Sequence, residues 1–208
     1  MTRRRTTVLL VAGALSASGV VVGWVGGQRA ESTSIAAPSA GVIGPVSPFQ
    51  GSVVPPGVRV PDLTLSDQDG RPISLRGLRG RPWVVTFLYT KCDESCPPQA
   101  HQIKGALDDL GRDVPVVAIS VEPEEDTPES AREFIQEVRM IGRMSILLGT
   151  RPELARAWKG FAVQPQSPKV EHQSRIALID AEGFQRVGFT LDQATPERIA
   201  HDLRVLGA

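Results

Sequence analysis

Residues 83–97 read Trp-Val-Val-Thr-Phe-Leu-Tyr-Thr-Lys-Cys-Asp-Glu-Ser-Cys-Pro, so a strand-like run leads directly into a paired cysteine motif. The run before the first cysteine is almost wholly apolar, which is typical of a strand buried at the centre of a sheet. Pro97 and Pro98 disfavour a helical conformation in the residue before them but are tolerated in the first turn of a helix. The pattern therefore predicts a helix that begins at Pro97, with Cys96 as its N-cap and Cys92 in the loop before it.

Apolar runs and amphipathic stretches alternate along the chain beyond this motif. Strands are expected at 114–121, 146–148, 175–180 and near 187–189, and helices at 97–110, 128–141, 152–158 and 196–206. In the second helix, the residues expected on the buried stripe are Phe134, Ile135, Val138 and Ile141. Upstream, residues 62–65 and 72–75 flank an Asp-Gln-Asp-Gly turn and predict a hairpin. The order of elements predicts an α/β fold with a central mixed sheet, flanking helices and an N-terminal β-hairpin.

Composition excludes several functional classes. Lys and Arg together number 23, as do Asp and Glu, so no bulk positive field recruits nucleic acid. Two cysteines are too few for a disulfide scaffold or a four-thiolate zinc site. A hydrophobic content of 41% is enough for a folded core.

The first residues predict a membrane segment. Residues 6–28 carry no charge, and at about 1.5 Å per helical residue they just cross a hydrocarbon core of about 30 Å. Residues 1–27 are therefore expected to form a single anchor, with a cleaved signal peptide as the alternative. Arg3, Arg4 and Arg5 favour the cytoplasmic side, which places the rest of the chain outside. No cysteine follows the apolar run, which excludes a lipoprotein-type anchor.

The next 30 residues have the composition of a tether. Residues 28–57 contain five Pro, four Gly, five Ser and only two charges, which cannot bury a core. We therefore expect a flexible linker at 28–57 and one folded domain at 58–208.

The two cysteines carry the clearest chemical signal. A thiol at a helix N-terminus faces unpaired backbone N–H groups and the positive end of the helix dipole, which favours the thiolate. Thiolate is the form needed both for nucleophilic attack and for binding a soft metal. The alternative is a structural disulfide, but so short a ring constrains little of the unfolded chain, which favours a chemical role.

One of the three histidines is a candidate third ligand. His101 and His201 lie on expected helices and are expected to be solvated. His172 directly precedes the strand expected at 175–180, and together with Cys92 and Cys96 it would complete a metal site. Thiolates select Cu(I), and an added imidazole also supports Cu(II). Zinc accepts the same donors but usually needs a fourth ligand, which nothing obvious supplies.

At this point the chain resembles the SCO/SenC family of thioredoxin-like, membrane-tethered copper proteins. The resemblance covers about residues 61–192. The motifs that carry it are Leu75 with Leu78-Arg79-Gly80-Arg81-Pro82, Phe87-Leu88-Tyr89-Thr90-Lys91-Cys92, Cys96-Pro97, Ile119-Ser120-Val121-Glu122-Pro123-Glu124-Glu125-Asp126-Thr127-Pro128, Val170-Glu171-His172-Gln173-Ser174 and Leu178-Ile179-Asp180.

The resemblance implies a thioredoxin-like fold in which Cys92, Cys96 and His172 bind copper, as Cu(I) or Cu(II), with Cys92 and Cys96 also forming a redox disulfide. It implies a metallochaperone rather than an enzyme, delivering copper to the CuA centre of cytochrome c oxidase. The expected partners are the CuA-bearing subunit, a thiol reductant or another copper carrier, and the membrane. The expected location is the bacterial cytoplasmic membrane, with the domain facing the periplasm or cell exterior.

The competing function is that of a thiol–disulfide oxidoreductase or peroxiredoxin-like reductase, which would keep metal-site cysteines reduced. Thioredoxin-type reductases use Cys-x-x-Cys, whereas three residues separate Cys92 from Cys96. Peroxiredoxins need Pro-x-x-x-Thr-x-x-Cys, and Thr90 lies only two residues before Cys92. Each enzyme class therefore lacks a required part, although a secondary reductase activity stays compatible with the dithiol.

Overall fold

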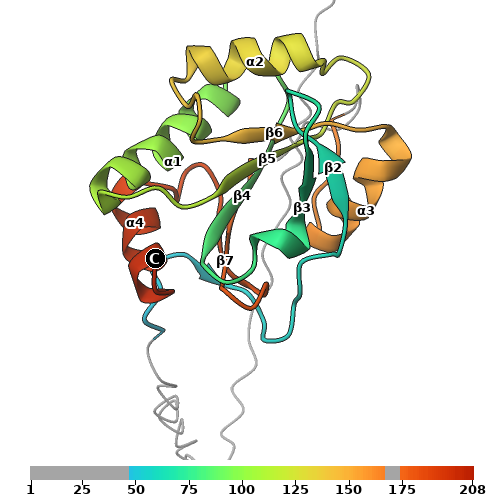
Figure 1. Cartoon of the computed structure of the whole chain (residues 1–208). Coiled ribbons are helices and arrows are strands. Elements are labelled where there is room, and N and C mark those ends of the chain that lie inside the picture. The colour runs from blue at the N-terminus through green and yellow to red at the C-terminus, as the bar shows by residue number, and fades with distance from the viewer. Residues whose placement is uncertain (1–46, 167–173) are drawn as a thin grey trace, which may run out of the picture. The chain divides into compact units, whose positions relative to one another are not determined.

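The computed structural model describes residues 47–166 and 174–208, which build a mixed six-stranded sheet with helices on both faces (Figure 1). The expected membrane segment, most of the expected linker and His172 lie outside the described residues. The elements in chain order are β1 (Ser52–Val53), β2 (Thr64–Ser66), β3 (Pro72–Ser74), the 3-10 helix η1 (Leu75–Leu78), β4 (Trp83–Leu88), α1 (Cys96–Leu110), β5 (Val116–Ser120), α2 (Pro128–Glu137), β6 (Ser145–Leu147), α3 (Arg151–Phe161), β7 (Ile176–Ile179), β8 (Gln185–Phe189) and α4 (Pro196–Val205).

The sheet has the strand order β1-β8-β7-β4-β5-β6. Strands β4, β5 and β6 are parallel, whereas β7 pairs with β4, β8 with β7 and β1 with β8 in antiparallel fashion. The hairpin of β2 and β3 forms a separate two-stranded sheet. The predicted mixed sheet and N-terminal hairpin are therefore confirmed.

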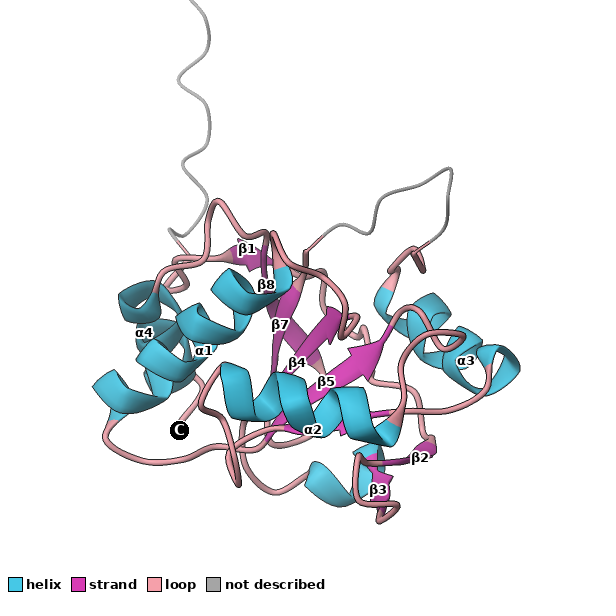
Figure 2. Ribbon diagram, turned by 90° about the horizontal axis from the view of Figure 1, so that it is seen from above, coloured by secondary structure: helices cyan, strands magenta, loops and turns pink. Residues whose placement is uncertain are grey.

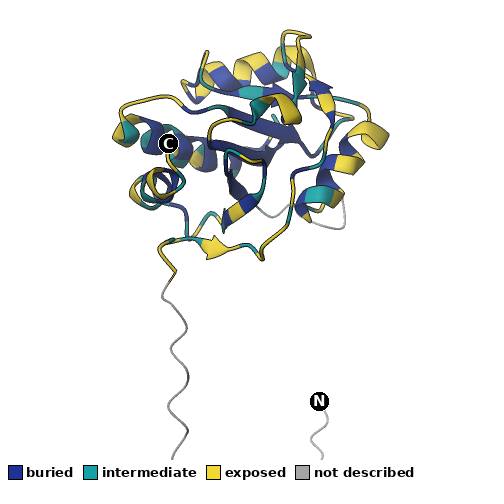
Figure 3. Ribbon diagram, turned by 60° about the horizontal axis from the view of Figure 1, so that its bottom comes forward, coloured by how far each residue is buried: buried dark blue, intermediate teal, exposed yellow. Residues whose placement is uncertain are grey.

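Successive side chains of the central strands point to opposite faces of the sheet, which divides the core into two layers. Val84 and Leu88 of β4 pack with α1, α2 and α4, whereas Val85 and Phe87 pack with α3 and the hairpin. Seen from above, α1, α2 and α4 lie on one side of the sheet and α3 on the other (Figure 2). The central strands and the inner faces of the helices are buried, whereas the edge strand β1 is exposed (Figure 3). Because β4 is covered on both faces, its continuous apolar sequence is explained.

Helix α2 ends four residues earlier than the apolar pattern predicts, and Ile141 is not on its buried stripe. The N–H of Met140 donates to the carbonyl of Ile135 at 2.9 Å, and the N–H of Arg139 donates to the carbonyl of Gln136 at 3.1 Å. Arg139 adopts a left-handed conformation with φ 56°. This Schellman motif turns the chain so that Met140 is buried and Ile141 is 71% exposed. The left-handed residue here is an Arg rather than a Gly, so the sequence contains no glycine that would have predicted where this helix ends.

The folded domain begins earlier than residue 58, because the end of the expected linker packs against it. The N–H groups of Gln50 and Gly51 donate to the two carboxylate oxygens of Asp202 on α4, at 2.8 and 2.9 Å. Asp202 is fully buried, and β1 pairs with β8. A Cβ on Gly51 would lie 2.4 Å from the side chain of Val187, so only glycine allows this close approach.

Helix α3 is longer than the expected 152–158, because it runs from Arg151 to Phe161. In the described part of the chain, no helix is long and apolar enough to cross a membrane.

Candidate functional site

The two cysteines lie where β4 ends and α1 begins. Cys96 is the first residue of α1 and Ser95 is the N-cap, so the predicted N-cap is wrong by one residue. Cys92 lies in the preceding turn, where its N–H donates to the carbonyl of Tyr89 at 3.3 Å. Both thiols are free and buried, with exposed fractions of 5% for Cys92 and 1% for Cys96. The dithiol is therefore a compact, shielded pair at the carboxyl edge of the parallel strands, where α/β sheets bind ligands.

Cys92 is the thiolate of the pair. Its pKa is lowered to about 4, chiefly by a hydrogen bond from the Cys96 thiol and then by contact with the Ser95 side chain, against the opposing effect of burial. The N–H of Cys96 points at the Cys92 sulfur at 3.3 Å, and Ser95 Oγ lies 3.4 Å from it. The N-terminus of α1 therefore stabilises the thiolate of Cys92, which lies in the loop before the helix. The sequence pattern had placed this support on Cys96.

Cys96 has the opposite electrostatic environment. Its hydrogen bond to the Cys92 sulfur raises its pKa, and burial raises it further. Tyr89 belongs to the same environment: burial raises its pKa, and the hydrogen bond between its phenol and Cys92 raises it further. The site thus holds one negative charge on Cys92 and keeps a proton on Cys96.

A buried carboxylate ties the start of the cysteine loop to two neighbouring elements. Asp126 Oδ1 accepts the N–H of Thr90 at 2.7 Å and its hydroxyl at 2.8 Å. Asp126 Oδ2 accepts the hydroxyl of Ser120 at the end of β5, and Thr90 Oγ1 lies 2.8 Å from Ser130 Oγ on α2. Because Thr90 lies two residues before Cys92, Asp126 positions the loop that carries the thiolate. Burial raises the pKa of Asp126.

A buried glutamine connects the dithiol helix to the strand that follows residues 167–173. Gln99, in the first turns of α1, is 1% exposed. Its side-chain amide donates to the carbonyl of Phe87 at 3.1 Å and to the carbonyl of Arg175 at 3.5 Å. It also donates to Thr86 Oγ1, which itself donates to the Arg175 carbonyl at 3.0 Å. No role was expected for Gln99 or Asp126, since a single polar residue in a helix or loop gives no local signal of burial.

The expected third ligand, His172, lies outside the described residues. Its role as a metal ligand therefore stays a prediction. Within 47–166 and 174–208, no three His, Cys, Asp or Glu side chains form a group that could hold a metal ion. His101 is exposed on α1, as expected. His201, expected to be solvated, is only partly so, because its Nδ1 lies 2.9 Å from Asp202 Oδ1.

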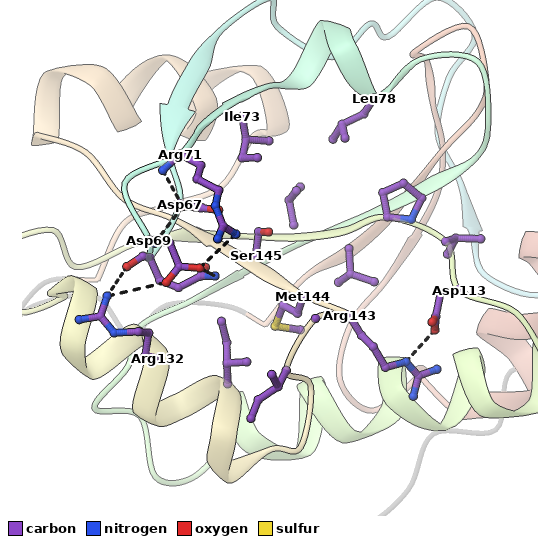
Figure 4. A pocket seen from close by; sticks show the side chains of 18 of the residues that line it. Asp67, Asp69, Arg71, Ile73, Leu78, Asp113, Arg132, Arg143, Met144 and Ser145 are labelled. Atoms are coloured by element: carbon purple, nitrogen blue, oxygen red, sulfur yellow. Dashed lines mark hydrogen bonds and ion pairs between the residues drawn. The ribbon is translucent and has the colours of Figure 1, made fainter.

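A cavity of about 580 Å³ lies at the other end of β5 from the dithiol (Figure 4). Several of its charged side chains neutralise each other: Arg71 lies 3.3 Å and Arg132 3.9 Å from Asp69, and Arg143 lies 2.7 Å from Asp113. Among residues 47–166 and 174–208, no cysteine or histidine lines this cavity. Its one soft donor among the described residues is the thioether of Met144, with no thiolate or imidazole beside it, so the dithiol remains the candidate site.

Fold and site together define a thioredoxin-like protein with a thiolate–thiol pair at the start of its first helix. The SCO1/SenC family model matches residues 57–207, and the chain belongs to this family. A SCO1 protein homolog of Bacillus subtilis is 31% identical over 134 residues, which cover 60% of this chain and 69% of the relative.

Solved structures agree with this assignment. ScoI of Bradyrhizobium japonicum, solved with copper bound, is 28% identical with a TM-score of 0.61, covering 71% of this chain and 99% of that chain. BsSco belongs to the Sco family of cytochrome c oxidase assembly proteins, and a disulfide switch has been identified in it. It is 28% identical with a TM-score of 0.64, covering 74% of this chain and 96% of that chain.

Proposed function

We propose that this protein is a copper metallochaperone that binds copper through Cys92, Cys96 and His172. The recipient is the CuA-bearing subunit of cytochrome c oxidase. The observation that carries the proposal is the buried pair of free thiols, in which the N–H of Cys96 points at the Cys92 sulfur at 3.3 Å. Family membership and the copper-bound relative support the choice of metal.

The donor set fits Cu(I) as cargo. Thiolates select Cu(I), and Cys92 is deprotonated before any metal arrives. Cys96 holds a proton, which must leave when its sulfur becomes a ligand, so loading should release a proton at neutral pH. With copper absent, loss of two electrons and the remaining thiol proton to an oxidant joins the two sulfurs as a disulfide. A thiol reductant must then return the pair to the binding form.

The contacts of the residues on either side of 167–173 support His172 as the third ligand. On one side, the N–H of Gln166 donates to the carbonyl of Val121 at 3.0 Å, just beyond β5. On the other side, the carbonyl of Arg175 is bound to β4 and α1 through Thr86 and Gln99. Both contacts lie at the carboxyl edge that carries the dithiol. His172 is three residues from Arg175, and an extended chain spans about 3.3–3.6 Å per residue.

The proposed location is outside the cytoplasmic membrane, where the CuA recipient is expected. The uncharged run at 6–28, preceded by Arg3, Arg4 and Arg5, supports a single N-terminal anchor with this orientation. Protease added to spheroplasts should then degrade the domain, whereas protection until lysis would contradict the orientation.

A thiol–disulfide oxidoreductase is the second candidate, because the low pKa of Cys92 also suits a nucleophile. Attack on a protein disulfide requires access to the sulfur, and only 5% of Cys92 is exposed. A metal ion needs far less space. The burial of the pair therefore favours the copper function over the enzyme.

Replacement of His172 separates the two functions. His172→Ala leaves the dithiol intact, so Cu(I) binding should persist but weaken by at least the roughly 10–100-fold seen for changes around a ligand. Cu(II) prefers nitrogen and oxygen donors and should lose most of its affinity and its thiolate charge-transfer band. His101→Ala, at an exposed position on α1, is the matched control and should behave as wild type.

Copper titration followed by absorption spectroscopy, together with oxidase assembly in cells, measures both properties at equal thiol content. Unchanged Cu(II) affinity and normal assembly in His172→Ala would contradict the three-ligand site. Slower disulfide exchange with unaltered copper binding would favour the oxidoreductase instead.

A further inference from the structure

Gln99 is a buried amide that binds the first turn of α1 to two strands. It lies three residues after Cys96, so the two residues are neighbours on one face of the helix. Its side-chain nitrogen donates to the carbonyl of Phe87 at 3.1 Å and, at 3.5 Å, to the carbonyl of Arg175 just before β7. It also donates to Thr86 Oγ1, which donates to the same Arg175 carbonyl at 3.0 Å. One side chain therefore joins the helix turn that carries Cys96 to the end of β4 and to the start of β7.

The orientation of this amide is fixed by its neighbours. A carbonyl oxygen can only accept a hydrogen bond, so the group that faces the carbonyls of Phe87 and Arg175 must be the NH₂ group of Gln99. A Glu side chain has the same shape, but its ionised carboxylate would bring oxygen against both carbonyls with no hydrogen to share. A Met side chain has a similar length and no donor. The two replacements therefore separate the donated hydrogen bonds from the space that the side chain fills.

The burial of this amide gives the dithiol end of α1 a defined arrangement. Gln99 is 1% exposed, and an amide in a core is unfavourable unless its hydrogen bonds are made. The buried positions that follow it on the helix are filled by small or apolar side chains, namely Ala100, Ile103, Ala106 and Leu107. A satisfied polar group in a core adds rigidity and favours a single packing. Because Gln99 lies beside Cys96, that rigidity acts on the turn that carries the thiol.

We propose that Gln99 is a positioning residue of the copper site. It holds the turn with Cys96 at a fixed distance from the end of β4, which leads to Cys92, and from the peptide group of Arg175. The inference rests on the proposed function, in which the third ligand precedes Arg175 in the chain. Cu(II) prefers a tetragonal arrangement of its donors, so its binding depends on these distances more than the binding of Cu(I) by the two thiolates does.

The first measurement is made on the reduced, copper-free full chain in detergent. The carbonyl of Arg175 and the N–H of Ile176 belong to one peptide group, so hydrogen exchange at Ile176 reports whether this group is held. In Gln99→Met, exchange at Ile176 should be about three- to tenfold faster, because one hydrogen bond to the group is lost. Gln99→Glu should show a larger increase, because an acceptor replaces the donor.

The second measurement is copper binding by the same variants at equal thiol content. Gln99→Met should lower Cu(II) affinity by about 10–100-fold, as changes around a metal ligand do, and should shift the thiolate charge-transfer band. Its Cu(I) affinity should change far less. Leu107→Ala is the control, since Leu107 is buried on the same helix about two turns further on. This control should lower the Tm but leave the Cu(II) affinity and the band unchanged.

Unchanged Cu(II) binding in Gln99→Met, with wild type binding copper, would overturn the inference and leave the proposed function standing. Unchanged exchange at Ile176 would overturn it as well. An equal loss of Cu(II) affinity in Leu107→Ala would also overturn it, because the loss would then follow stability rather than position. An absence of copper binding by wild type would contradict the proposed function itself, and the inference with it.

Discussion

Replacing Asp126 tests whether this carboxylate holds the cysteine loop in place. Asp126→Ala removes the acceptor for three donors, namely the N–H of Thr90, its hydroxyl and the hydroxyl of Ser120. Each buried donor left unsatisfied costs about 1–3 kcal/mol, so the free energy of unfolding should fall by about 3–9 kcal/mol. For a domain of this size, 1 kcal/mol corresponds to about 2–4 °C in Tm, and a loss near 4 kcal/mol predicts a decrease of about 8–16 °C.

Asp126→Asn separates geometry from charge. Its amide oxygen can still accept from Thr90, and its NH₂ group can donate to Ser120, so the loss should be about 1 kcal/mol or less at neutral pH. Burial raises the pKa of Asp126 in the folded protein, so the native state binds a proton more readily than the unfolded chain. Wild type should therefore gain stability relative to Asp126→Asn as the pH falls through that raised pKa, and lose it as the pH rises.

The assay is thermal unfolding of the fragment 47–208, with hydrogen exchange at the Thr90 amide as the local measurement. Asp126→Ala should expose this amide and weaken Cu(I) binding, because the loop before Cys92 loses its anchor. Asp93→Ala, in the same loop but exposed, is the control and should change stability by about 0.5 kcal/mol or less. A loss below about 1 kcal/mol in Asp126→Ala would refute the reasoning, as would equal losses in the Ala and Asn variants.

Three further expectations concern the thiolate and two features of the fold. The ultraviolet thiolate absorbance of the reduced protein should show one group that titrates near pH 4, and this group should be missing in Cys92→Ser. Because the pKa of Cys92 is lowered in the folded protein, its thiolate stabilises the fold above the ordinary thiol pKa, and this stabilisation disappears as the pH falls through about 4. Fragment 58–208 should be less stable than 47–208 by about 3 kcal/mol or more in urea unfolding, since Asp202 loses two N–H donors; equal stability would show that β1 is dispensable. Met140→Ala should cost about 2–5 kcal/mol, whereas Ile141→Ala should cost about 0.5 kcal/mol or less, and the reverse order would contradict the Schellman ending of α2.

Local sequence was informative wherever a local interaction decides the structure. The apolar run of β4 predicted a central strand because burial on both faces requires it, and Asp-Gln-Asp-Gly predicted the β2–β3 turn. Proline in the first helical turn located the starts of α1, α2 and α4 to within one residue. The position of the dithiol at a strand-to-helix junction followed from the same signals.

Only the tertiary structure decided which groups are charged, buried or paired. A shift of the N-cap by one residue gives the helix N–H to Cys92 rather than Cys96, and so reverses the assignment of the thiolate. The Asp202 contact that docks residues 50 and 51 spans about 150 positions of the chain, which no local pattern can reveal. Burial and hydrogen bonding depend on the packing of distant segments. The buried amide of Gln99, which joins α1 to the carbonyl of Arg175, is therefore visible only in the folded chain.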